Sequence, residues 1–113
     1  MQRIYYCTGT SFLTGDDIAD AVLEYAWVLA QYGRFDLVRV PTRRADGSAG
    51  SSTLLVGPSS QISIEDVAPT APGDELIARD FVQKIKERSA HLREPLPVVA
   101  FDAALFDPEP EDQ

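Results

Sequence analysis

The sequence predicts an α+β fold: a two-layer sandwich in which two helices pack on one mixed sheet of about five strands. The chain has 113 residues, 44% of them hydrophobic and 25% charged, which is typical of one globular domain. Short β-branched or aromatic runs alternate with two longer segments whose apolar residues recur at helical spacing. Their order is strand, helix, three strands, helix and strand, which indicates a split-βαβ-like arrangement.

The first strand and the first helix are predicted from the first 32 residues. Residues 3–8 are β-branched or aromatic and apolar on both faces, so we expect a buried strand. Residues 8–17 read as a polar loop, in which Thr14 and Asp17 have the spacing of a capping box. A helix should then cover residues 17–32, because its apolar side chains fall on one side: Ile18, Val22, Tyr25 and Leu29.

Three further strands are expected to form a meander. The Asp46-Gly47 step lies in a long connection between two strand-like runs and is a hairpin signal. Ile62 and Ile64 alternate with polar residues, as in a half-buried strand. The three expected strands are residues 35–40, 53–56 and 62–64.

The second helix should follow a proline-rich link, with Thr70 or Asp74 as a candidate cap. Residues 98–101 are apolar on both faces, which favours an interior strand. We therefore assign residues 1–102 to a single domain, followed by an acidic, proline-containing tail over 103–113 that we expect to be frayed. The apolar side of the second helix comprises Ala78, Phe81, Val82, Ile85 and Leu92.

The charge distribution argues against nucleic acid and anionic membranes as partners. The formal net charge is -8, and five of the 18 acidic residues lie beyond residue 100, which leaves 13 acidic against 10 basic residues before it. Both kinds of partner require clustered Lys and Arg. Arg39, Arg43 and Arg44 form a small patch without interleaved aromatic residues. We interpret it as a solvated face or as side chains that pair with Asp36 and Asp46.

Composition also indicates where the protein works. No apolar run approaches the roughly 18 residues that a membrane helix needs, and no signal peptide is recognisable, so we expect a cytoplasmic protein. The basic residues comprise eight Arg and two Lys, and Asn is absent, a bias that we expect of a GC-rich bacterial genome.

No motif for catalysis, cofactor binding or metal binding stands out. Cys7 and His91 are the only residues of their types, which excludes an internal disulfide and the usual metal-ligand spacings. We expect Cys7 in a core strand, where a thiol is inert, and His91 on the polar side of its helix. We therefore predict no catalytic residues, no cofactor and no metal site.

An alternative function involves the segment Gly9–Asp17, which reads as a loop between a strand and a helix amino terminus. Such a loop can present backbone amides to a phosphate ester. Carboxylates gathered there could also hold a divalent cation, if Asp102 at the end of the last strand lies nearby. This small-molecule or phosphoester site would comprise Thr10, Ser11, Thr14, Asp16, Asp17 and Asp102.

The preferred hypothesis is a non-catalytic protein that acts through protein–protein contact, as a homodimer or an accessory subunit. Trp27 and Val28 bracket the polar stripe of the first helix, with Glu24 and Gln31 between them. Large rings placed in this way are enriched at interfaces. Leu105 and Phe106, which lead into an acidic stretch, are a second candidate contact.

Overall fold

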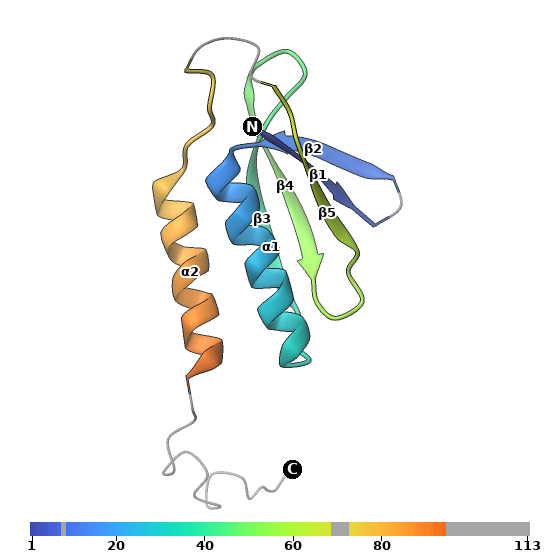
Figure 1. Ribbon diagram of the computed structural model, residues 1–113, viewed down its shortest axis with the longest axis vertical. Helices are drawn as coiled ribbons and strands as arrows, with labels where there is room; N and C mark the ends of the chain where they lie inside the picture. Colours follow the sequence, from blue (N-terminus) through green and yellow to red (C-terminus); the bar gives the residue numbers. More distant parts are fainter. Residues whose placement is uncertain (8, 69–72, 95–113) are drawn as a thin grey trace, which may run out of the picture.

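The computed structural model describes residues 1–7, 9–68 and 73–94, which form a two-layer α+β sandwich (Figure 1). One layer is a five-stranded sheet and the other contains two helices, so the predicted fold class is confirmed. The predicted order of strand, helix, three strands and helix is present, with one additional strand before the first helix. The elements are β1 Gln2–Tyr6, β2 Thr10–Thr14, α1 Asp16–Gln31, β3 Asp36–Arg43, β4 Ala49–Val56, β5 Ile62–Asp66 and α2 Arg79–Arg93.

The sheet has the strand order β4-β3-β2-β1-β5, and each pair of neighbours is antiparallel. The expectation of a mixed sheet is therefore wrong for the described strands. It rested on a parallel pairing with the strand predicted over 98–101, and these residues lie outside the described part of the chain. The first strand, β1, lies in the sheet interior, as predicted, but it is buried on one face and not on both: Ile4 is buried, whereas Tyr5 is exposed.

The additional strand, β2, occupies most of the segment that the sequence assigns to a loop. It pairs with β1 from Gln2↔Thr14 to Tyr6↔Thr10. The turn between them contains Cys7, which is exposed and has a positive φ of 56°. Cys7 is thus not in a core strand, contrary to the prediction, because the chain reverses direction at this residue.

The last described strand, β5, does not continue a meander. It pairs with β1 at the opposite edge of the sheet from β4, with Ile64 in register with Ile4. Ile62 and Ile64 are half-buried and pack against the hydrophobic core beside Ile4. Pairing with β1 places these two side chains against the core, which favours this position for β5 over one next to β4.

The sheet consists of two ribbons, β3–β4 and β2–β1–β5, which are joined at one residue pair, Leu13↔Arg43. Across the ribbons, the Tyr6 hydroxyl donates a hydrogen bond to the carbonyl of Leu55. The helix α1 contacts β1, β3 and β5, and therefore strands of both ribbons. Packing on α1 thus joins the ribbons where backbone pairing is sparse.

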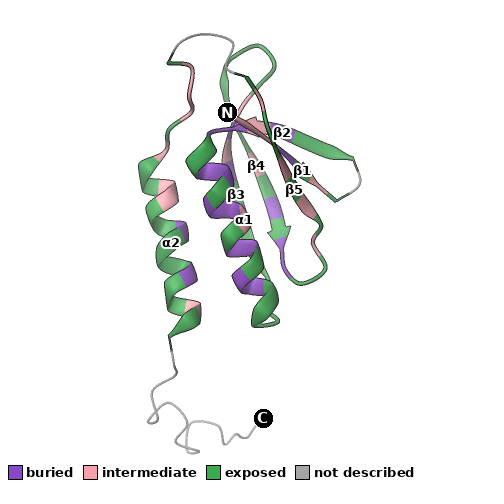
Figure 2. Cartoon of the chain, in the orientation of Figure 1, coloured by how far each residue is buried: buried purple, intermediate pink, exposed green. Residues whose placement is uncertain are grey.

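The helices lie side by side, and α1 contacts both α2 and the sheet. Figure 2 shows buried residues along α1, whereas most of α2 is exposed. Neither helix within the described residues has the length and apolarity required to cross a membrane. The buried residues of α1 are Ile18, Ala19, Ala21, Val22, Tyr25, Ala26, Val28 and Leu29.

The first turn of α1 is capped by a residue distant in sequence. Gly15 occupies the N-cap position and has no side chain that could accept a hydrogen bond from the first turn. Thr14 is buried at the end of β2, where its hydroxyl donates to the carbonyl of Pro41 at 2.7 Å, so the predicted capping box does not form. Instead, Oε2 of Glu75 accepts the backbone N–H of Asp16 at 2.5 Å. The stretch before α2 therefore caps α1 through Glu75. The helix α2 begins at Arg79 and not near residue 74.

Candidate interaction surface

The candidate interaction surface is centred on Trp27, in the second half of α1. The Trp27 side chain is 60% exposed, as the polar stripe of the helix predicts. Beside it lies a groove of about 390 Å³ between α1 and the turn that joins β4 to β5. The residues lining this groove carry no charge; they are Leu23, Ala26, Trp27, Ala30, Gly57, Pro58, Ser60 and Ile62.

Val28 does not belong to this surface. Its side chain is completely buried, which corrects the expectation that it borders Trp27 in an interface. The expectation assumed one apolar stripe facing one partner layer. Because α1 packs against both the sheet and α2, a wider arc of the helix is buried, and Val28 falls within that arc.

Polar residues flank Trp27 on α1. Glu24 and Gln31 are exposed and lie three and four residues from Trp27, on the same side of the helix. The Glu24 carboxylate forms an ion pair with Arg93 of α2 at 3.5 Å. An aromatic centre with a polar rim is the usual composition of a protein interface. The second candidate contact, Leu105 and Phe106, lies outside the described residues.

The residues of the predicted ligand loop are spread along β2 and the start of α1. Thr10 and Ser11 are exposed at the far end of the strand from Asp16 and Asp17. Thr14 is four residues after Thr10 along the strand, which corresponds to about 13 Å in an extended chain. Asp16 pairs with the Met1 amino group at 2.9 Å. The sixth residue, Asp102, lies outside the described part of the chain.

Other predicted clusters are also dispersed. The turn that contains Cys7 and the carboxyl end of α2, which contains His91, lie on opposite sides of the molecule (Figure 1). Within residues 1–7, 9–68 and 73–94, no three His, Cys, Asp or Glu side chains gather as metal ligands would. In the basic patch, Arg43 pairs with Asp74, and Arg44 donates to the carbonyl of Ala49 at 2.5 Å.

The predicted acidic partners of that patch are engaged elsewhere. Within the β3–β4 turn, Asp46 accepts the Ser48 hydroxyl at 2.6 Å and the backbone N–H of Ser48 at 2.9 Å, and these hydrogen bonds lower the pKa of its carboxyl group. Asp36 accepts two hydrogen bonds on Oδ2, from the Tyr25 hydroxyl at 2.5 Å and from Nη1 of Arg88 at 3.0 Å. This arrangement links α1, β3 and α2.

The Tyr25–Asp36–Arg88 cluster was missed by the sequence analysis, which placed Tyr25 among purely apolar residues. A tyrosine on the buried side of a helix requires a partner for its hydroxyl group, and that requirement is the signal that could have revealed the cluster. Burial and the hydrogen bond to Asp36 raise the pKa of Tyr25 to about 12. The phenol therefore remains a neutral donor throughout the physiological range.

The raised pKa of Tyr25 predicts a loss of stability in alkali. An unfolded tyrosine ionises near pH 10. Between about pH 10 and 12 the unfolded chain releases a proton that the folded chain retains, so the free energy of unfolding falls as the pH rises through this range. Tyr25→Phe removes the ionising group and should flatten this part of the profile, measured by urea denaturation at successive pH values.

Tyr32→Phe is the matched control, because Tyr32 is an exposed tyrosine at the end of the same helix. This variant should retain the wild-type loss of stability between pH 10 and 12. A profile that Tyr25→Phe leaves unchanged would show that the Tyr25 hydroxyl is not held in the neutral form by the fold.

Comparison of the chain with family models, with curated proteins and with solved structures finds no match.

Proposed function

We propose that this protein acts through protein–protein contact, as a homodimer whose two copies meet at Trp27. The observation that carries the proposal is the exposed indole beside an uncharged groove on the same face. A two-fold interface brings the same patch of each copy together, so the patch must contain both a protruding group and a recess for it. The Trp27 surface has both.

The groove is suited to receive an aromatic ring from a second copy. Ala26, Ala30 and Gly57 give its lining small side chains, and no charged group would lose water when the ring enters. Glu24 and Gln31 would remain at the solvated rim. We place this contact in the cytoplasm and expect neither nucleic acid nor a membrane to take part.

We expect a weak dimer, because the contact is centred on one side chain and one groove of about 390 Å³. Interfaces much smaller than about 1,200 Å² of total buried area are mostly transient. We therefore expect a dissociation constant on the order of 10 µM or more, so that dilution releases monomers. An accessory role, in which a different protein occupies the groove, is the competing outcome.

Concentration-dependent fluorescence and sedimentation test the proposal. Trp27 is the single tryptophan of the chain, so its emission reports directly on this surface. Raising the protein concentration from about 1 µM to about 500 µM should shift the emission to shorter wavelengths, reduce quenching by iodide and increase the sedimentation coefficient. Trp27→Ser should remain monomeric over the same range.

Ile77→Ser is the matched control, because Ile77 is 62% exposed and lies near the amino end of α2, away from the groove. This variant should dimerise like the wild type. A wild-type protein that stays monomeric at every concentration, with constant iodide quenching, would overturn the homodimer, as would equal dimerisation of Trp27→Ser.

A further inference from the structure

A second and larger groove lies between the carboxyl halves of α1 and α2 and the start of β3. Its volume is about 640 Å³. Leu29, Phe35 and Leu92 provide apolar side chains within it, and charged side chains surround them. An apolar groove with polar groups at its rim is typical of a site that binds a short peptide or a small molecule.

The rim of this groove has cations that are not neutralised. Arg88 is paired with Asp36. Glu87 accepts a hydrogen bond from the neutral amide of Gln83 at 3.1 Å and keeps its negative charge, so the lining holds three Lys or Arg side chains against two acids. Among the described residues, neither Arg34 nor Lys84 has an acidic partner within ion-pair distance. These two side chains are therefore available to an anionic ligand.

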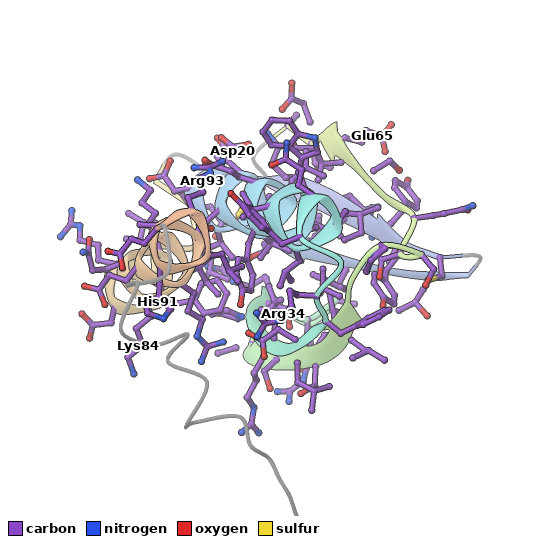
Figure 3. All side chains as sticks on the ribbon, turned by 90° about the horizontal axis from the view of Figure 1, so that it is seen from below. Asp20, Arg34, Glu65, Lys84, His91 and Arg93 are labelled. Carbon is purple, nitrogen blue, oxygen red and sulfur yellow. The ribbon has the colours of Figure 1, made fainter. Side chains whose placement is uncertain are left out.

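The free cations share one side of the molecule. Arg34 and Lys84 lie on the same side in Figure 3, whereas Asp20 and Arg93 lie on the other. Arg34 follows α1 and Lys84 belongs to α2, so they border the groove from different elements. A ligand that contacts both cations must lie across the apolar residues between them.

The segment that follows α2 has the complementary composition. Residues 95–113 lie outside the described part of the chain and contain no Lys, Arg or His. Within them, Leu105-Phe106 is a pair of large apolar side chains. The next six residues contain four acids: Asp107, Glu109, Glu111 and Asp112. An apolar anchor followed by carboxylates matches an apolar groove with free cations at its rim.

The chain also leaves α2 at this groove, because Leu92, in the last turn of the helix, is among its lining residues. Residues 95–104 precede the apolar pair, and ten residues can span about 33 Å. The groove extends along roughly two turns of α2, about 11 Å. Tethering over this distance gives an effective concentration on the order of 1 mM, so even a weak contact would be occupied.

We propose that this groove is a binding site for an acidic peptide with an apolar anchor, and that residues 105–112 of the same chain occupy it. Leu105 and Phe106 would pack on the apolar residues, and the carboxylates that follow would pair with Arg34 and Lys84. Any partner peptide of similar composition would then have to displace this segment before it could bind.

Peptide binding in trans tests the proposal on the full chain. The probe is a fluorescein-labelled peptide of residues 103–113, and its anisotropy is followed at low salt. Leu105→Ser combined with Phe106→Ser should free the groove, so this double variant should bind the probe at least about 10-fold more tightly than the wild type. Higher salt should weaken the binding, because the rim charges are exposed.

Two charge reversals in the double variant locate the site. Lys84→Glu should weaken probe binding at least about fivefold, whereas Lys86→Glu, two residues along the same helix and outside the groove, should leave it unchanged. Circular dichroism should be the same for all variants, since both lysines are exposed.

Several results would overturn the proposal. Equal probe binding by the wild type and the double variant would show that the segment does not occupy the groove. No binding to the double variant, or equal effects of the two lysine reversals, would show that the groove is not the site. Occlusion of the wild-type groove only at high protein concentration would assign the segment to a second copy and exclude binding within one chain.

Discussion

Gly15→Ala should lower the free energy of unfolding by about 3 kcal/mol, because no room exists for a side chain at the start of α1. A Cβ on Gly15 would overlap the carbonyl oxygen of Leu76 and lie 3.0 Å from its carbonyl carbon. The Gly15 backbone has φ of -73° and ψ of 158°, which any residue adopts, so the cost is steric. Relieving the overlap would displace the stretch that carries the capping carboxylate of Glu75. Urea denaturation gives the change.

The matched control for this substitution is Gly9→Ala. No atom lies within 4 Å of the position that its Cβ would take. The expected change in the free energy of unfolding is within about 0.5 kcal/mol. Equal stabilities of the Gly15 and Gly9 variants would contradict the close approach of the Leu76 backbone to α1.

Ile4→Ala should cost about 3 to 4 kcal/mol, since the substitution leaves a cavity in the centre of the core. Ile4 lies on the interior strand β1, is fully buried, and is in register with Phe12 on one side and Ile64 on the other. These neighbours belong to strands fixed by their own hydrogen bonds, so the cavity cannot close easily. Thermal and urea unfolding should both show the loss.

The adjacent residue, Tyr5, provides a control on the opposite face of the sheet. Tyr5 points to the open face of β1 and is exposed, with its hydroxyl donating to Glu65 at 2.9 Å. Tyr5→Ala should therefore cost about 1 kcal/mol or less. Similar losses of unfolding free energy for the two variants would contradict a sheet that the helices cover on one face, the face of Ile4.

Sequence patterns predict those features of the fold that residues close together in the sequence determine. The α1 stripe that includes Ile18 and Leu29 is a periodic signal within one segment, and the structure buries both residues. The start of α1 has no such local cause. Thr14 and Asp17 have the spacing of a capping box, yet the cap comes from Glu75, about 60 residues away in sequence. A spacing rule cannot detect a partner that only the tertiary fold brings near.

The candidate surfaces also differ in how far the sequence predicts them. The exposure of Trp27 is predictable, because an indole among polar helical neighbours has one side free of the core. The burial of Val28 is not, because it depends on where α2 lies. The groove between the helices also arises only when α1, α2 and β3 meet, and neither Arg34 nor Lys84 has a sequence signal that relates it to the other.

The single backbone junction at Leu13 and Arg43 has a dynamic consequence. Opening this pair, together with the hydrogen bonds from Thr14 to Pro41 and from Tyr6 to Leu55, would separate the β3–β4 hairpin from the other three strands without breaking their internal ladders. What opposes this hinge is the side-chain packing of α1 against strands on both sides of it. We therefore expect the hairpin to be a separate cooperative unit, whose amide protons exchange with solvent through openings smaller than global unfolding.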